Sequence, residues 1–501
     1  MTMTDHAVTR QSSKVAVGIA IGVVMLAVMR FCFASRAELL PEEAYYWTYL
    51  QHPALSYFDH PPMVAWVIGL GTSWLGDTEL GVRFGTILLS LVNTVLVFLL
   101  ARLWFGAPAA WWAALIFNVT PIYAGLGFFA FPDGPLILFW LLTLWAMSQA
   151  LLKNQSSYWW LAGLAYGAAM LSKYTAVLLG PSLLLFLWLT PSYRHWLKRP
   201  HPWLAVLLAL AVFSPVIIWN AQHDWASFAF QTSRTESHKP HSFVPALLFW
   251  PMQIGVYSPL IFALFAVAAI RAIQRRHTEA WAFATAFFWP LFLIFVLASF
   301  KTEIHVNWTV PAFLTLLPAA GAVFHERVQT SRRWRIAGWI ALVLNLVFLI
   351  VAFNTIVTGR PRILTSSHAG GWRELATQVE AAELQLERET SLDPFIIGVD
   401  KYNLAAELSF YTSKPAELVN TFALGKHGLG FRFWTNLDSF AGHPAVAVLT
   451  KTNEPTLLSL RNYFDRVDLP RPIHVPTIGA KPRTIYLVNC YGYRPPVAAP
   501  R

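Results

Sequence analysis

The chain has 501 residues, of which 56% are apolar and only 13% are charged, and its mean hydropathy is +0.48. Charged residues make up about a quarter of an ordinary soluble domain, so this composition excludes a typical water-soluble protein. The formal charge is +11, but no long block of Lys and Arg occurs, which argues against nucleic acid as a partner. Cys32 and Cys490 lie far apart in the sequence, and we expect neither a disulfide nor a cysteine-based metal site.

Long apolar segments occur along most of the first 357 residues. A spanning helix needs about 20 mostly apolar residues, and by that length we expect about eleven spans, or up to about thirteen. The predicted spans are 15–35, 84–104, 108–127, 134–152, 158–173, 175–190, 203–220, 243–270, 280–299, 308–324 and 336–356. We expect the first to be an uncleaved anchor rather than a signal peptide, because no small-residue cleavage site follows it.

The charges of the connecting loops alternate from one loop to the next. The basic loops carry Arg102; Lys153; Arg194, Lys198 and Arg199; Arg271, Arg275 and Arg276; and Arg327, Arg332, Arg333 and Arg335. The acidic loops carry Glu42, Glu43, Asp59, Asp77, Glu79, Asp133, Asp224, Glu236 and Glu303. Because basic loops stay in the cytoplasm, we expect the acidic loops to face the periplasm from a multi-pass inner-membrane protein.

The first periplasmic loop and the C-terminal tail differ in composition from the predicted spans. Within the first periplasmic loop, 36–83, we expect two short interfacial helices at 44–51 and 64–75, because both are aromatic and nearly uncharged. Residues 358–501 alternate helix-like and strand-like segments, which predicts a small α/β domain on the same periplasmic side. These segments are helices at 371–388 and 403–411 and strands at 395–399, 445–450 and 484–491. The predicted domains are therefore 1–357, in the membrane, and 358–501.

The first periplasmic loop contains the densest group of ionisable side chains. Glu42 and Glu43 are adjacent, and Asp59 and His60 follow between aromatic segments. Acids in such loops are commonly solvated charges, but they can also act as a general base or as metal ligands. An acid drawn into an apolar cavity loses solvation and gains basicity, so we take these residues as candidates for catalysis.

Further candidate site residues lie at the ends of apolar segments, on the same predicted periplasmic face. Asp133 starts the fourth span, where a carboxylate also suits the helix dipole. Lys173 and Lys301 lie on the acidic side against the charge rule, and such ionisable groups favour a functional reading over simple snorkelling. His305 and Asn307 follow Lys301 at a helix mouth. A lysine on this face suits a phosphate at the membrane surface.

A polar loop near residue 219 could instead hold a metal ion. It carries His223, Asp224, Arg234, Glu236, His238, Lys239 and His241. No closed ligand set is visible, and histidines in polar loops usually ligate nothing.

Several of these motifs resemble a known family. They are Pro41-Glu-Glu-Ala-Tyr-Tyr-Trp47, Tyr57-Phe-Asp-His-Pro-Pro62, Pro132-Asp133, Leu171-Ser-Lys-Tyr174 and Asn307-Trp308. Together they resemble the polytopic glycosyltransferases of the GT-C class. The most similar group is the bacterial dolichyl-phosphate-mannose-protein mannosyltransferase-like branch, which includes the aminoarabinose and galacturonic acid transferases that modify lipid A.

The resemblance implies roles for individual residues. The first acidic position of the first periplasmic loop is the family's catalytic carboxylate, commonly Asp followed by Glu, where this chain has Glu42-Glu43. Which of the two is the base stays open. Asp59-His60 falls where relatives often have Glu-Lys, which implies Asp59 near a metal or the acceptor and His60 near phosphate.

The resemblance and the residues together predict a membrane glycosyltransferase with an α-helical GT-C fold. It would move a sugar from a polyprenyl phosphate to a hydroxyl of lipid A, lipopolysaccharide, another envelope glycan or a protein. The catalytic residues would be Glu42, Glu43 and Asp133, and the substrate and phosphate ligands Asp59, His60, Lys173, Tyr174, Lys301, His305 and Asn307. No cofactor is required, with a divalent ion at Asp59 and His223 as the open alternative. A transporter or flippase for a lipid-linked or anionic substrate is the second hypothesis, although no repeated halves are evident.

Overall fold

A computed structural model describes residues 3–234, 243–361, 370–414, 418–479 and 481–495. The chain forms two compact units, each described by itself below. The helical unit comprises Met1–Cys32, Leu55–Val67 and Arg83–Ile350, and the α/β unit comprises Phe33–Ala54, Ile68–Val82 and Val351–Arg501. The α/β unit therefore contains two pieces of the first loop as well as the tail.

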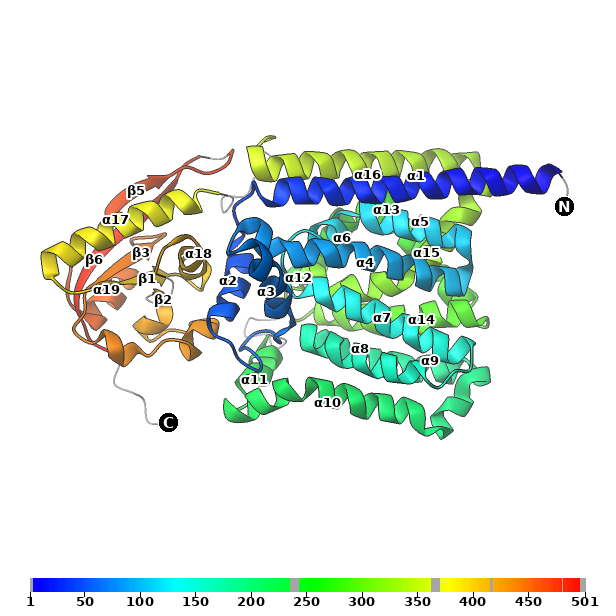
Figure 1. Ribbon diagram of the computed structural model, residues 1–501, viewed down its shortest axis with the longest axis horizontal. Helices are drawn as coiled ribbons and strands as arrows, with labels where there is room; N and C mark the ends of the chain where they lie inside the picture. Colours follow the sequence, from blue (N-terminus) through cyan, green and yellow to red (C-terminus); the bar gives the residue numbers. More distant parts are fainter. Residues whose placement is uncertain (1–2, 235–242, 362–369, 415–417, 480, 496–501) are drawn as a thin grey trace. The chain divides into compact units, whose positions relative to one another are not determined.

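Bundled helices make up almost all of the helical unit (Figure 1). They are α1 (Met3–Ala34), α4 (Glu79–Phe105), α5 (Ala107–Val119), α6 (Pro121–Leu126), α7 (Asp133–Leu152), α8 (Tyr158–Ser172), α9 (Leu179–Leu189), α10 (Pro200–Gln222), α11 (Ala226–Ser233), α12 (Val244–Tyr257), α13 (Pro259–Gln274), α14 (Glu279–Ala298), α15 (Val310–Thr330) and α16 (Arg332–Thr358). Three 3-10 helices join them: η1 (Tyr174–Leu178), η2 (Pro191–Lys198) and η3 (Val306–Thr309).

Many of these helices have the length and composition of membrane spans. Within the described residues, seven helices qualify: α1, α4, α7, α10, α14, α15 together with η3, and α16. An eighth is added if the bent pair α12 and α13 counts as one span, and shorter apolar helices occur at Met63–Leu75, Ala107–Val119 and Tyr174–Leu189. The chain is thus a mostly helical, multi-pass membrane protein, and the total of eleven spans stays a prediction.

Two segments predicted as continuous spans are broken, and proline is the cause in both. The segment predicted at 243–270 bends by 107° between α12 and α13, where Ser258 has φ 65° and Pro259 begins the next helix. The segment predicted at 108–127 ends its first helix at Val119, and Thr120 is extended before Pro121. Proline lacks an N–H and disfavours helical backbone in the preceding residue, and each break lies directly before a proline; α12 and α13 together still have the length and composition of one bent span.

Small residues let α8 and α10 approach closely. A Cβ added at Gly163 would lie 2.6 Å from the carbonyl oxygen of Ala205 and 2.9 Å from its Cα. Close backbone approach at small residues is a general means of joining helices in lipid, where apolar burial drives little association. The contact fixes α8, whose last residue precedes Lys173.

In the α/β unit, helices cover both faces of a mixed sheet (Figure 1). Its helices are α2 (Pro41–Gln51), α3 (Met63–Leu75, within this unit from Ile68), α17 (Trp372–Thr390), α18 (Asn403–Tyr411) and α19 (Glu454–Tyr463), with η6 (Thr421–Leu424), η7 (Leu429–Phe433) and η8 (Leu437–Phe440). Its strands are β1 (Phe395–Val399), β2 (Leu418–Asn420), β3 (Ala445–Leu449), β4 (Phe464–Val467), β5 (Arg471–Val475) and β6 (Arg483–Tyr493). The order is β2-β1-β3-β6-β4, and β5 pairs with β6.

Strand β1 lies between two apolar layers. It runs parallel to β2 and β3, with Ile397 opposite Ala447. Ile396 faces the core under α17 and α18, whereas Phe395 and Ile397 face the opposite core with α19. A strand buried on both faces is continuously apolar, which is why Phe395–Val399 was predictable from sequence. The short or polar strands β2, β4 and β5 were not predicted.

Substitution of Gly163 tests the close packing of α8 on α10. Gly163→Val places a branched side chain against the Ala205 backbone, and we expect the free energy of unfolding to fall by about 1–3 kcal/mol. Gly22→Val in α1 is the matched control, because a Cβ there meets nothing within 4 Å. Thermal unfolding of the purified protein measures both; equal midpoints for the two variants would contradict the packing.

Candidate active site

The two adjacent acids of the first loop occupy the first turn of α2. Pro41 begins this helix, and a carboxylate in the first turn interacts favourably with the helix dipole. Glu43 is fully buried, and its Oε2 accepts the N–H of Leu40 at 3.0 Å, as in a capping box. Glu42 is half-buried, and its Oε1 accepts the hydroxyl of Tyr402 at 3.1 Å. Glu43 thus supports the start of the helix, while Glu42 is the more open carboxylate.

Residues from the tail hold α2 in place within the α/β unit. The Tyr45 hydroxyl accepts the N–H of Gly430 at 3.0 Å, and the Tyr45 and Tyr402 rings are 5.1 Å apart. His52, just after α2, stacks on Trp434 with ring centres 4.9 Å apart. The orientation of the first-turn acids therefore depends on residues from the far end of the chain.

A buried acid that we did not propose as a site residue lies close to these carboxylates. Glu407 on α18, which packs against α2, is fully buried, and within the described residues neither of its carboxyl oxygens has a hydrogen-bond partner. Burial raises the pKa of Glu407 well above its usual range; the charges of Glu38, Glu43 and Glu42 act in the same direction, and Arg483 opposes them. Glu407 is thus a buried acid with a raised pKa, on a helix that packs against the one carrying two candidate catalytic carboxylates. An acid within an otherwise apolar helix was the available sequence signal.

In the helical unit, three of the predicted site residues meet. Lys173 Nζ lies 2.8 Å from Asp133 Oδ1 and 3.0 Å from Oδ2, and Asn307 Nδ2 donates to Asp133 Oδ2 at 2.8 Å. Asp133 is 1% exposed and Lys173 is 7% exposed. We call these three residues the aspartate–lysine–asparagine cluster.

Helix ends bring the cluster together. Asp133 is the first residue of α7, Lys173 follows the last residue of α8, and Asn307 lies in η3 before α15. Lys173 has extended backbone, with φ −159° and ψ 138°, so the chain leaves the helix there. A buried charge of either sign is costly unless it is paired and hydrogen-bonded, and the cluster meets that requirement for both.

The predicted residues Asp59, His60 and Tyr174 lie in the same unit. Gln231 Nε2 donates to the Asp59 carbonyl oxygen at 2.6 Å, and the Tyr174 hydroxyl is 2.6 Å from Ser227 Oγ. Residues of α11 thus support both segments.

His60 carries little positive charge at neutral pH. Burial holds its pKa well below the usual range, and the positive charges of Lys173 and Arg234 lower it further. The Arg234 guanidinium lies 5.1 Å from the centre of the Trp308 ring. Trp308 directly follows Asn307 in the sequence. Arg234 is therefore a cation of this region that we did not propose as a site residue; its place in a polar loop gave only a weak signal.

The remaining predicted residues have other surroundings. Lys301 is exposed, the His305 ring lies 5.4 Å from that of Trp308, and His223 stacks on Trp219 at 4.0 Å. In the part of the chain that the structure describes, no three His, Cys, Asp or Glu side chains gather as a metal site. Glu236, His238, Lys239 and His241 lie outside the described residues.

Comparison with known proteins connects the sequence to glycosyl transfer. Residues 59–219 match the family model of the dolichyl-phosphate-mannose-protein mannosyltransferases. A lipid A galacturonosyltransferase of Rhizobium johnstonii is 26% identical over 396 residues, which cover 76% of this chain and 78% of that protein. An undecaprenyl phosphate-alpha-4-amino-4-deoxy-L-arabinose arabinosyl transferase of Edwardsiella ictaluri is 27% identical over 325 residues, 61% of this chain and 58% of that one.

Solved structures share the fold over nearly the whole chain. ArnT from Cupriavidus metallidurans in its apo state matches with a TM-score of 0.65 at 19% identity, covering 95% of this chain and 98% of ArnT. The same protein bound to undecaprenyl phosphate matches with a TM-score of 0.66 at 20% identity, covering 94% and 98%. The expected fold is thereby confirmed at the level of architecture.

Neutralising Asp133 tests the buried ion pair. Asp133→Asn leaves the Lys173 ammonium buried beside an amide, and we expect the free energy of unfolding to fall by about 3–5 kcal/mol. The double variant Asp133→Asn/Lys173→Met should recover part of this loss, because it leaves no unpaired charge. Thermal unfolding measures the series, with exposed Lys301→Met expected within about 0.5 kcal/mol of the parent. A double variant no more stable than Asp133→Asn would contradict the pairing.

Glu407 should make stability depend on pH. The pKa of Glu407 in the folded protein lies above the 4.5 of an unperturbed glutamate. Its contribution to the free energy of unfolding is therefore complete below about pH 4.5, and this contribution is lost as pH rises toward the folded pKa. Over that window the slope reaches about 1.4 kcal/mol per pH unit. We expect Glu407→Gln to lose less thermal stability than the parent between pH 5 and pH 8. Exposed Glu374→Gln should retain the parent's dependence; identical slopes for all three proteins would refute the assignment.

Proposed function

We propose that the chain is a polytopic glycosyltransferase of the GT-C class and that it transfers a sugar from a polyprenyl phosphate to an acceptor hydroxyl of lipid A. The solved neighbour that binds undecaprenyl phosphate and the relatives named for lipid A and aminoarabinose transfer support this donor and acceptor. The observation that carries the proposal is the buried Lys173, held by Asp133 and Asn307 where three helix ends meet. A preorganised ammonium of this kind stabilises the charge of a departing phosphate.

Glu42 is the proposed base. A base needs a carboxylate that a substrate can reach, and Glu42 is half-buried, whereas Glu43 is fully buried and accepts the Leu40 N–H. Both carboxylate oxygens of Asp133 are already engaged by Lys173 and Asn307, and the residue is 1% exposed. Asp133 and Asn307 therefore act as positioning residues for Lys173.

The reaction is a single displacement with inversion. Glu42 takes the proton of the acceptor hydroxyl, and the oxygen attacks the anomeric carbon as the bond from that carbon to the phosphate oxygen breaks. The electron pair of that bond leaves with the polyprenyl phosphate. No general acid is needed, because the second pKa of such a phosphate is near 6.

The phosphate receives its positive charge from Lys173 and Arg234. Arg234 lies against Trp308, and its planar guanidinium suits phosphate oxygens. His60, whose low pKa keeps it neutral, contributes a hydrogen-bonding ring rather than a charge. Lys301 is exposed and is proposed as an outer phosphate contact. The displacement balances without a cofactor, and a divalent ion at Asp59 remains an expectation from the resemblance.

The proposed residues of each unit face the periplasm. The loops that contain Glu42, Asp133 and Asn307 are the acidic set, and the alternating basic loops would stay in the cytoplasm. The charge alternation supports an inner-membrane protein with eleven spans in this orientation and with its tail in the periplasm.

Paired glutamine variants test the assignment of the base. In proteoliposomes with labelled undecaprenyl-phosphate aminoarabinose or galacturonic acid as donor and lipid A as acceptor, we expect Glu42→Gln to lower kcat by about 10²–10⁴-fold. Glu43→Gln is the matched control; it weakens the start of α2 and should lower thermal stability while keeping kcat within about tenfold.

The opposite ranking would assign the base to Glu43, and full activity of both single variants and the double variant would refute a carboxylate base in α2. Mass spectrometry of lipid A from a deletion strain identifies the acceptor. Unchanged lipid A alongside a missing sugar on another glycan or on protein would move the proposal to that acceptor.

A further inference from the structure

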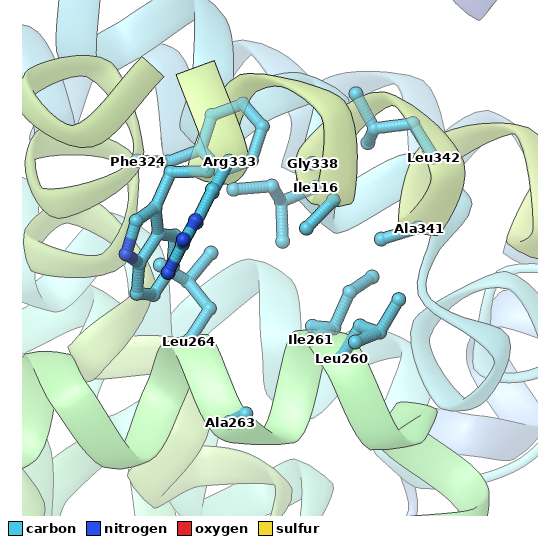
Figure 2. A pocket seen from close by; sticks show the side chains of 12 residues that line it. Ile116, Leu260, Ile261, Ala263, Leu264, Phe324, Arg333, Gly338, Ala341 and Leu342 are labelled. Atoms are coloured by element: carbon cyan, nitrogen blue, oxygen red, sulfur yellow. The ribbon is translucent and has the colours of Figure 1, made fainter. Parts of the chain in front are cut away.

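The helical unit contains an apolar cavity that the proposed reaction does not use. Its volume is about 270 Å³, and residues of α5, α13, α15 and α16 line it. Figure 2 shows Leu264 and Ile261 on one side, with Gly338, Ala341 and Leu342 on the other. The lining carries one charged residue, Arg333.

This cavity is remote from the aspartate–lysine–asparagine cluster. Asn307 precedes the first turn of α15, and Phe324, which lines the cavity, lies near the other end of that helix. At a rise of 1.5 Å per residue, the two positions are about 25 Å apart along the helix axis. The cavity and the cluster are therefore separate sites within one unit.

The cavity opens at the exposed surface of α13 and α16. Leu260 on its rim is 44% exposed, and Ala263 and Arg333 are exposed as well. Because α15 ends at Thr330 and α16 begins at Arg332, Arg333 lies where two spans meet a polar boundary. An apolar chain could thus enter from the bilayer while a polar group stays at its surface.

Among the basic residues near this turn, Arg333 is the one that lines the cavity. Arg327 lies over the Trp334 ring, 5.6 Å from its centre, and Arg335 Nε donates to the Val328 carbonyl at 2.9 Å. Within the described residues no ion pair or hydrogen bond engages the Arg333 side chain. Its guanidinium lies at the cavity beside Phe324 (Figure 2).

We propose that this cavity binds one acyl chain of an anionic phospholipid, with the lipid phosphate on Arg333. An apolar cavity stays dry and takes apolar ligands, and a guanidinium matches phosphate geometry. Basic pockets between membrane helices favour anionic headgroups. The site is independent of the proposed sugar transfer.

Native mass spectrometry of the full-length protein tests the site. The detergent-purified chain is titrated with dioleoyl-phosphatidylglycerol, and one tight adduct is expected, stronger than that of dioleoyl-phosphatidylcholine. Arg333→Gln should weaken it about fivefold, the effect of one basic residue at an anionic headgroup. Arg332→Gln, exposed on the same turn but outside the lining, is the matched control and should bind like the parent. Ala341→Leu fills the chain space and should weaken binding as well.

Thermal midpoints show whether each variant is folded. Equal affinity for the two phospholipids, or equal weakening by Arg332→Gln and Arg333→Gln, would overturn the proposal. Displacement of phosphatidylglycerol by undecaprenyl phosphate at lower concentration would overturn the choice of occupant.

Discussion

The pairing of Asp133 with Lys173 is the interaction on which the centre of the helical unit depends. Neither charge could be buried alone, since an unpaired ion in an apolar interior is strongly destabilising. Together, at 2.8 Å and with Asn307 on the second oxygen, they satisfy one another. The start of α7, the end of α8 and the approach to α15 must therefore meet, and the proposed phosphate site follows from that meeting.

A second constraint acts on the acids of α2. This helix occurs early in the sequence, but its partners are Tyr402, Gly430 and Trp434, from the end of the chain. A helix this short is marginal in isolation, so its aromatic packing within the α/β unit is what orders the first turn. Within the α/β unit, residues of the tail therefore order the helix that carries the proposed base.

Charged residues at the ends of apolar segments were the most informative feature of the sequence. Lys173 and Asp133 were each proposed from their position at the end of an apolar segment, and the structure brings them together. Their contact was not predictable, because hydropathy and charge describe one segment at a time, whereas this contact joins two segments that are distant in the sequence. The same limit applies to the predicted spans at 108–127 and 243–270: apolar composition continues across Thr120 and Ser258, whereas the helix breaks at both residues, each directly before a proline.

The sequence by itself determined that this is a multi-pass membrane protein whose motifs resemble the GT-C glycosyltransferases, and it indicated which face carries the acids and the exceptional lysines. Composition, charge and motifs are local properties and need no knowledge of partners. Only the tertiary structure decided that Glu43 supports a helix start while Glu42 stays open, and that Glu407 is buried with no hydrogen-bond partner among the described residues. It also decided that Arg333 borders an apolar cavity. Burial and hydrogen bonding depend on which distant segments pack together, and that information is spread over the whole chain.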